Sequence, residues 1–313
     1  MSEVSPERTL WNLGRGALAA RLVGLVADLE IAAALAGGPR HVDDLAVSKG
    51  ADADTLRRML RALASDGVFA EEAPGVFRHT PASELLLTPG WDAYAHFLGG
   101  VFHRAAGELD ASGAPTFSRL FGTDFWSWLA ADPDERAAFD RAMLQGSARR
   151  LDRLDSYSWR GDETVVDVGG GNGSLLLGLL ARRPGLRGVV FDLPETTVGD
   201  LGDRCVFVPG SFFESVPPGD VYVMSTILHD WDDDHATAIL ETIRAAATPA
   251  SRLLLLEGVV AAGNEPDGAK WLDLLMLALF AGRERDEVQW RELLARAAWA
   301  PEFTDELIVC RPC

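Results

Sequence analysis

The glycine-rich segment 169–173 is the part of the chain whose residue types and spacing point most directly to a chemistry. Gly169, Gly171 and Gly173 recur at every second position, after the β-branched run 164–168 and before a second apolar run. A strand, a tight glycine turn and a helix start open a nucleotide-type βαβ unit. Ser174 stands where the dinucleotide pattern needs its third glycine. The spacing therefore favours a nucleoside-bearing ligand whose chain lies along the loop over a pyrophosphate seated on the helix.

An acidic residue follows this segment at the spacing that nucleoside recognition requires. Residues 188–191 predict a second strand that ends at Asp192, about 20 residues beyond the loop. A carboxylate at this place can accept hydrogen bonds from both hydroxyls of a ribose. A solvated strand end would also explain an aspartate here, but its pairing with the glycine loop favours nucleoside binding.

The elements that would position these residues alternate between strands and helices, which predicts a doubly wound α/β sheet. We place the domain boundary at Gly161–Asp162, so that residues 1–160 form a first domain and 161–313 a second. The later strands are expected at 205–208, 221–224 and 252–256, with one or two more within 303–310. The later helices are expected at 232–247, 269–280 and 286–298.

The N-terminal third predicts a winged-helix pattern. Ala/Leu-rich helices are expected over about residues 10–36 and a short helix at 42–46. In the next helix one buried face is formed by residues at the spacing i, i+3, i+4 and i+7, namely Leu56, Met59, Leu60 and Leu63. Apolar runs on both sides of Pro74–Gly75 indicate a hairpin.

A winged helix invites a DNA-binding interpretation, with Arg57, Arg58 and Arg61 on a recognition helix. Residues 1–90 hold nine basic and twelve acidic residues, so no electrostatic footprint for nucleic acid exists. We therefore expect these arginines to form the solvated or subunit-facing side of a packing helix.

Bulk composition excludes several classes of protein. The chain has 313 residues and a formal net charge of −18, which argues against nucleic acid or an anionic membrane as the main partner. The acidic start lacks a signal-peptide pattern, and the three cysteines lack metal-ligand spacing. We expect a cytoplasmic protein with reduced thiols and no metal site.

Several motifs together resemble the small-molecule O-methyltransferases of the caffeic-acid and bacterial polyketide type, which use S-adenosylmethionine. The matching segments are Val166–Gly173, Phe191–Pro194, Leu228–Asp233 and Gly282–Arg285, and, in the N-terminal half, Gly37–Pro39, Leu56–Leu63 and Thr80–Pro81. The resemblance covers nearly the whole chain, and its His-Asp-Trp motif is more specific than the glycine loop. It implies a Rossmann-like catalytic domain preceded by a mostly α-helical winged-helix dimerisation domain, and hence a homodimer.

The resemblance also implies the catalytic residues. His229 would be the general base that deprotonates a substrate hydroxyl, and Glu257 and Glu284 would flank and orient it. A histidine titrates near neutrality, and a carboxylate on its other ring nitrogen fixes the tautomer and stabilises the imidazolium. A buried histidine bonded to the backbone is the structural alternative for His229.

Two positions depart from the family pattern near the expected cofactor. Ser211, before Phe212, stands where the family usually has an aspartate that meets the adenine amino group. Ser225 stands where many members have a basic residue near the cofactor. The chain is also short between Pro194 and Cys205 and after Trp299, so the second crossover helix and the last strand pair are expected to be trimmed. We expect weakened cofactor binding, since one neutral hydrogen bond contributes about 1 kcal/mol.

The acceptor is expected to be an aromatic or polycyclic secondary metabolite with a hydroxyl group. The expected substrate contacts are Asp230, Met276, Phe125, Trp126 and Met143, although core packing would explain the apolar ones equally well. Two other classes stay open: a related enzyme that binds the cofactor but catalyses hydroxylation, decarboxylation or a pericyclic step, and a winged-helix regulator.

Overall fold

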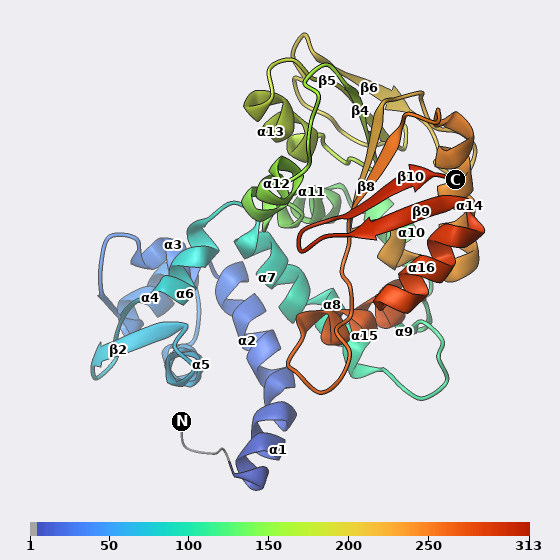
Figure 1. Cartoon of the computed structure of the whole chain (residues 1–313). Coiled ribbons are helices and arrows are strands. Elements are labelled where there is room, and N and C mark those ends of the chain that lie inside the picture. The colour runs from blue at the N-terminus through green and yellow to red at the C-terminus, as the bar shows by residue number, and fades with distance from the viewer. Residues whose placement is uncertain (1–4) are drawn as a thin grey trace. The chain divides into compact units, whose positions relative to one another are not determined.

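A computed structural model describes residues 5–313, which form two compact units (Figure 1). The first unit extends to Leu109 and includes Trp126–Gln145; the second holds Asp110–Phe125 and Gly146–Cys313. A domain boundary after residue 160 stays a prediction. None of the helices found between residues 5 and 313 has the length and apolar character that crossing a membrane requires.

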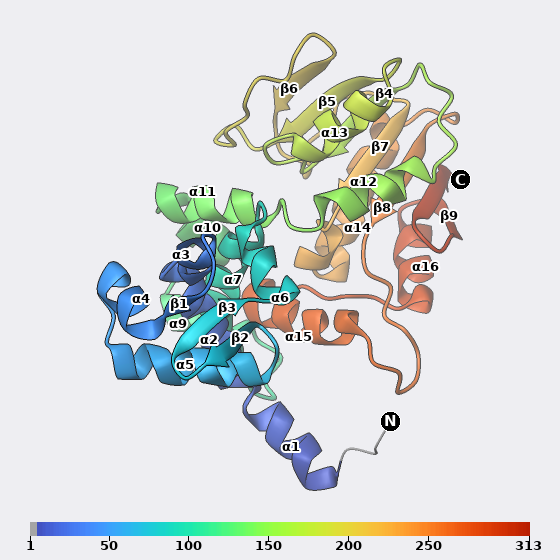
Figure 2. The same cartoon turned by 90° about the vertical axis from the view of Figure 1, so that its left-hand side faces the viewer.

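The first unit is mainly helical and carries one small antiparallel sheet of order β1–β3–β2. Its strands are β1 (Arg40–His41), β2 (Phe69–Ala73) and β3 (Val76–His79). The helices α4 (Val42–Lys49) and α5 (Ala53–Ser65) precede the hairpin, and α5 packs against β2 (Figure 2). This helix–helix–hairpin order confirms the predicted winged helix.

The first unit contains further helices before and after this motif. They are α1 (Pro6–Gly14), α2 (Gly16–Asp28), α3 (Ile31–Leu35), α6 (Pro81–Glu84), the 3-10 turn η1 (Leu85–Leu87), α7 (Trp91–Gly99), α8 (Val101–Gly107), α10 (Phe125–Ala130) and α11 (Pro133–Ala142). The first residue of α10 is counted with the second unit.

The helix α5 shows why the winged-helix pattern could be predicted from the sequence. Asp52 caps it by accepting a hydrogen bond from the Thr55 backbone N–H at 2.8 Å. Its apolar spacing places Leu56, Leu60 and Leu63 in the core of the unit, as predicted, whereas Met59 of the same predicted face is only partly buried against it. The exposed Arg58 lies 3.8 Å from Asp54, one turn earlier on the same helix.

The helices α2 and α7 cross at a pair of glycines. A Cβ on Gly24 would lie 2.7 Å from the Gly99 Cα, so the two backbones touch where no side chain fits. Arg21 reinforces the crossing by donating from Nη1 to the Gly99 carbonyl at 2.9 Å.

We expect Gly24→Val to lower the free energy of unfolding by about 1–3 kcal/mol, because the added side chain forces the two helices apart. Gly16→Ala is the matched control, since it lies on the same helix with no atom within 4 Å of the added Cβ. Urea unfolding of both variants measures the difference. Equal stability of the Gly24 variant and the parent would contradict the close crossing.

The second unit contains a seven-stranded, mostly parallel sheet of order β6–β5–β4–β7–β8–β10–β9, in which β10 runs opposite to the other six strands. The strands are β4 (Thr164–Val168), β5 (Arg187–Asp192), β6 (Cys205–Pro209), β7 (Val221–Ser225), β8 (Arg252–Leu256), β9 (Trp299–Phe303) and β10 (Ile308–Pro312). The helices are α9 (Thr116–Phe121), α12 (Ser147–Asp155), α13 (Ser174–Arg182), α14 (Asp233–Ala246), α15 (Gly268–Phe280) and α16 (Glu287–Arg296), with the 3-10 turn η2 (Leu228–Asp230).

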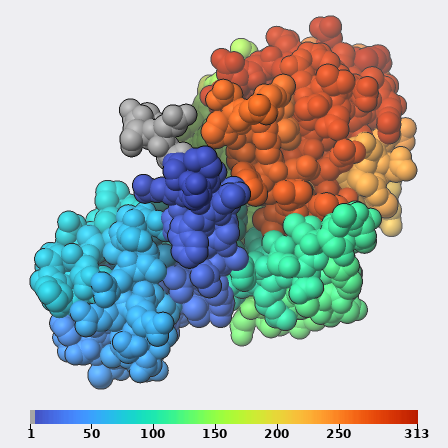
Figure 3. Space-filling view, turned by 90° about the horizontal axis from the view of Figure 1, so that it is seen from below, coloured from blue at the N-terminus to red at the C-terminus, as the bar shows by residue number. Residues whose placement is uncertain are grey.

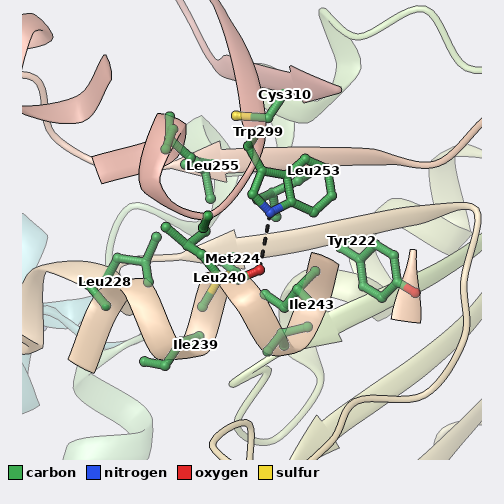
Figure 4. Close-up of a cluster of buried hydrophobic side chains, with 14 of the residues drawn as sticks. Tyr222, Met224, Leu228, Ile239, Leu240, Ile243, Leu253, Leu255, Trp299 and Cys310 are labelled. Atoms are coloured by element: carbon green, nitrogen blue, oxygen red, sulfur yellow. Dashed lines mark hydrogen bonds between the residues drawn. The ribbon is translucent and has the colours of Figure 1, made fainter. Parts of the chain in front are cut away.

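Two apolar cores cover the two faces of this sheet, because alternate strand residues point to opposite sides. On β7, Tyr222 and Met224 face the helices α14 and α16, whereas Val221 and Val223 face α12 and α13. Figure 4 shows the first core, where Trp299 donates from its indole nitrogen to the Leu240 carbonyl at 3.1 Å.

Of the two segments that were expected to be trimmed, one is trimmed in the structure and the other is not. Residues 193–204, between β5 and β6, form no helix, so the crossover helix is trimmed as predicted. The last strand pair is complete, and the expectation of its trimming was wrong. Five residue pairs hold β9 against β10, from Trp299 opposite Pro312 to Phe303 opposite Ile308.

Candidate functional site

The glycine segment follows β4 at the point where the strand order reverses, between β4 and β7. Ligands of doubly wound sheets bind at this switch point. Gly169, Gly171 and Gly173 have φ values of 73°, 55° and 79°, which favour glycine. A Cβ on Gly169 would lie 2.7 Å from a side-chain carbon of Ile227. The loops after β4 and β7 therefore touch, and Gly169 is required by both conformation and space.

Asp192 lies at the end of β5, beside this segment. One carboxylate oxygen accepts from the Gly171 N–H at 2.7 Å; the other accepts from the Leu193 N–H and the Thr196 hydroxyl, each at 2.7 Å. The structure thus joins Asp192 to the loop, as its spacing predicted. Thr196 was missed, and its only sequence signal is its place four residues after the aspartate.

Asp167 is a second acidic residue at the glycine segment that sequence reasoning missed. It is 3% exposed on β4, and its Oδ2 has no hydrogen-bond partner within residues 5–313. A Cβ on Gly170 would lie 2.8 Å from that oxygen, so the carboxylate lies directly behind the loop. Burial, with a smaller contribution from Asp192, raises the pKa of Asp167 to about 7 against the opposing charge of Arg150. The sequence signal was an acidic residue inside an apolar strand.

The raised pKa of Asp167 gives a pH-dependent prediction about stability. The carboxyl titrates near 3.8 when unfolded and at about 7 when folded, so the folded protein binds the additional proton between these values. Stability from this group is therefore complete below pH 3.8 and is lost as the pH rises through 7.

Asp167→Asn is always neutral and should be more stable than the parent at pH 8, by about 2–4 kcal/mol. The difference should shrink as the pH is lowered to about 5. Urea unfolding at both pH values measures it. A variant that is less stable than the parent at pH 8 would show that Asp167 is ionised and well compensated in the folded protein.

Ser211 and Ser225, the two departures from the family pattern, lie at the ends of the strands β6 and β7, which are separated in the sheet by β5 and β4. Ser211 follows β6 and accepts a hydrogen bond from the Phe213 N–H at 3.3 Å through its hydroxyl. Phe212 packs edge-on to Trp231, with ring centroids 6.0 Å apart. The hydroxyl of Ser225, at the end of β7, is buried and has no partner among residues 5–313.

His229 lies on the 3-10 turn η2, immediately after β7, and is 7% exposed. Its Nδ1 lies 2.6 Å from Glu284 Oε1, and its Nε2 lies 3.4 Å from Asp230 Oδ1. Burial alone would lower the pKa of His229, but the charge of Asp230 and the hydrogen bond to Glu284 outweigh it and raise the pKa to about 9. Burial also raises the pKa of Asp230, to about 7.

Glu257 and Glu284 act at different places around this histidine. Glu257 Oε1 accepts from the backbone N–H groups of Ile227 and Leu228 at 2.9 and 3.0 Å, so Glu257 holds the loop before the ring. Glu284 meets the ring itself, and its own N–H donates to Asp273 at 2.9 Å. Burial raises the pKa of Glu257.

Arg285 is a further positioning residue that the sequence did not single out. Its fully buried guanidinium donates to the carbonyls of Leu228 and Trp231, both at 2.9 Å, and to Asp233 at 2.9 Å. It therefore holds both ends of the turn that carries His229. The available signal was a second arginine after Glu284 in the Gly-Arg-Glu-Arg motif.

The predicted substrate residues are distributed over both units. In the second unit, Met276 is buried on α15, and Phe125 is fully buried, with its ring edge-on to Phe117 and Phe280. In the first unit, Trp126 packs edge-on to Phe139, and Met143 follows α11. Their part in substrate binding stays a prediction.

The second unit thus combines a seat for a nucleoside with a buried imidazole in the adjacent loop. A histidine oriented by a carboxylate can accept a proton from a hydroxyl group. This chemistry suits a reaction in which a bound cofactor supplies an electrophile and the protein supplies an activated nucleophile.

Comparisons with known proteins agree with this chemistry. The family model of the O-methyltransferase dimerisation domain matches residues 11–89, and that of the O-methyltransferase domain matches residues 103–300. Phenazine O-methyltransferase PhzM of Lysobacter antibioticus is 37% identical over 272 residues, which cover 82% of this chain and 80% of that protein. The mitomycin biosynthesis 6-O-methyltransferase of Streptomyces lavendulae is 36% identical over 298 residues, with coverage of 89% and 84%.

A solved structure adds the ligands of one relative. The O-methyltransferase NcsB1 from neocarzinostatin biosynthesis was crystallised with S-adenosyl-L-homocysteine and 1,4-dihydroxy-2-naphthoic acid. It superimposes on this chain with a TM-score of 0.79 and 31% sequence identity, covering 94% of this chain and 96% of the other.

Proposed function

Because the chain belongs to the S-adenosylmethionine-dependent O-methyltransferase family, we propose that it methylates a hydroxyl of an aromatic or polycyclic secondary metabolite, with His229 as the general base. The observation that carries this proposal is the 2.6 Å contact between His229 Nδ1 and Glu284 inside a buried site. The relatives whose names are given above are O-methyltransferases of phenazine and mitomycin biosynthesis.

The residues at the switch point fit S-adenosylmethionine, which supplies an electrophilic methyl group when bound. The oxygen of Asp167 that has no partner within residues 5–313 suits the ammonium group of the methionine moiety. Asp192 suits the ribose hydroxyls, and the loop at Gly169, Gly171 and Gly173 admits the close approach of a ligand. We assign Ser211, Phe212 and Ser225 to the remainder of the cofactor.

The proposed base acts through its two ring nitrogens. Glu284 holds Nδ1, so Nε2 is left to receive the proton of the substrate hydroxyl. The imidazolium formed in this step is stabilised by the same carboxylate. Arg285 and Glu257 keep the supporting turn in place through its backbone, so that the ring is already oriented before the substrate binds.

We also propose that the protein works as a homodimer through its N-terminal unit. Figure 3 shows the surface of α1 and α2. Their exposed apolar side chains are large, with Leu10 at 73%, Trp11 at 70% and Leu18 at 70%. Exposed apolar residues on neighbouring helical turns suit a protein interface, and the dimerisation-domain model matches this part of the chain.

Methyl-labelled S-adenosylmethionine, incubated with a panel of phenolic polyketides, naphthoic acids and quinols, tests the proposed activity. Label should pass to an oxygen of the acceptor and S-adenosylhomocysteine should form in equal amount. Conversion of an acceptor without transfer of label would instead support the non-methylating class. Sequence-selective DNA binding in place of any turnover would support the regulator.

A further inference from the structure

Both ring nitrogens of His229 face carboxylate oxygens. Glu284 Oε1 lies 2.6 Å from Nδ1, and Asp230 Oδ1 lies 3.4 Å from Nε2. A neutral imidazole has one N–H and one lone pair, so one nitrogen would direct its lone pair at a carboxylate. One additional proton removes this repulsion. The proton can lie on the ring, or it can lie on the Asp230 carboxyl, whose O–H then points at Nε2.

The charged groups around the ring favour that additional proton. Asp230 comes from the same turn, Glu284 from the segment after α15, and Glu257 from the end of β8; all three are less than 10% exposed. Two arginines lie beside the cluster: Arg285 donates to backbone carbonyls and to Asp233, and Arg153 donates to the backbone carbonyl of Glu257 at 3.4 Å, so neither pairs with the carboxylates around the ring. Three buried carboxylates therefore surround one imidazole, in agreement with the raised pKa values of His229 and Asp230.

A base that already carries a proton cannot accept one from a substrate. The site therefore needs an event that removes this proton before methyl transfer. S-Adenosylmethionine brings a positive charge, the sulfonium, to the glycine segment, which touches the loop of His229 through Gly169 and Ile227. A positive charge beside the cluster disfavours the protonated form.

We propose that Asp230 and His229 share one proton in the cofactor-free enzyme, and that the sulfonium charge of S-adenosylmethionine expels this proton to solvent. One cation enters the site and one proton leaves, so the charge of the site is conserved. His229 is then neutral and can accept the proton of the acceptor hydroxyl. The cofactor thus activates the base, and Asp230 is the residue that keeps the base protonated until the methyl donor is bound. The proposal rests on the proposed base role of His229.

The geometry of in-line methyl transfer gives the distance between the sulfonium and the ring, and this distance sets the expected shift of the apparent pKa. In an in-line transfer, a hydroxyl held about 3 Å from Nε2 and a methyl carbon about 3 Å beyond it would put the sulfonium within about 8 Å of the ring. At an effective dielectric constant of about 20, a unit charge at that distance lowers the apparent pKa of the pair by about 1–2 pH units.

The test is calorimetric titration of the full-length protein with S-adenosylmethionine and, separately, with S-adenosylhomocysteine. The second ligand differs by the absence of the methyl group and its positive charge. Repeating each titration at pH 8 in two buffers of different ionisation enthalpy counts the protons released. We expect about 0.5–0.8 proton per site with S-adenosylmethionine and close to none with S-adenosylhomocysteine. Equal release by the two ligands would overturn the proposal.

Substitutions of Asp230 and of a control residue test whether the released proton comes from the pair of Asp230 and His229. Asp230→Asn removes the charge opposite Nε2, and release should then fall below about a third of the parental value. His235→Asn is the matched control, because His235 lies 2.8 Å from Asp232 as an exposed pair in the same unit and should leave release unchanged. Release by the Asp230 variant equal to that of the parent would assign the proton elsewhere.

A third variant separates this proposal from the proposed function. His229→Asn should abolish the difference in proton release between the two ligands. If that variant also kept full methyl transfer, the base role would be rejected while the shared proton was retained. Loss of methyl transfer together with equal release by both ligands in the parent would reject only the shared proton.

Discussion

His229→Asn should lower kcat by about 10²–10⁴-fold, because the acceptor hydroxyl then loses the group that we propose removes its proton. The asparagine amide is close to the size of the ring edge and cannot act as a base near neutral pH. Cofactor affinity should change little, since the proposed cofactor residues Gly169, Gly171, Gly173 and Asp192 follow or end other strands. Single-turnover rates and calorimetric binding of S-adenosylhomocysteine measure the two quantities separately.

His235→Asn is the control for this experiment, because His235 is also paired with an aspartate but lies exposed on α14. It should retain parental turnover. Glu284→Gln provides a second comparison, since it preserves the hydrogen bond to Nδ1 but removes the charge that stabilises the imidazolium. Its rate should lie between those of the parent and of His229→Asn. Undiminished turnover in both site variants would mean that the proton goes to another group.

Gly282→Ala should reduce kcat by about 10²-fold, because it displaces the turn that carries the base. A Cβ on Gly282 would collide with the His229 carbonyl oxygen and with the Asp230 backbone, neither of which can rotate away as a side chain would. The same collision should lower the free energy of unfolding by about 1–3 kcal/mol. Steady-state turnover and urea unfolding of the same preparation measure both effects.

Gly268→Ala is the matched control, since it adds the same methyl group to the start of α15 with no atom within 4 Å. It should leave turnover and stability close to the parental values. If the Gly282 variant lost stability but kept its turnover, the turn would tolerate displacement, and the placement of His229 would not depend on this close approach. Parental values for both quantities would contradict the packing itself.

Most elements of the fold could be predicted because their signals are local. The β-branched run 164–168, the run 252–256 and the apolar spacing on α5 each contain the pattern that their own burial requires. The last strand pair was harder to predict, because β9 includes Pro301 and β10 includes Pro312, and proline is a poor strand residue. Their pairing with each other and with β8 holds them in the sheet, and that is a long-range interaction.

The residues of the candidate site were likewise predictable where their signals are local, and were missed where only burial identifies them. The spacing of the glycines and of Asp192 and the motif around His229 identified the two loops, because residues close in the chain carry both signals. Asp167 and Arg285 were missed, since an acidic residue within an apolar strand and a second arginine within a charged motif do not by themselves show what the charged group contacts. Only burial revealed that Asp167 lacks a partner within residues 5–313 and that Arg285 holds the turn of the base.

The amino-acid sequence alone identifies a glycine loop of the kind that binds nucleosides, a histidine next to an aspartate, and two glutamates far along the chain. The tertiary structure decided which carboxylate meets which atom: Glu284 reaches Nδ1, Asp230 lies against Nε2, and Glu257 binds the backbone before the ring. The physical reason is that the charge of an imidazole depends on distances of a few ångströms between groups that are up to 55 residues apart. Such distances are set by the packing of the sheet and its loops, and residue spacing along the chain does not contain them.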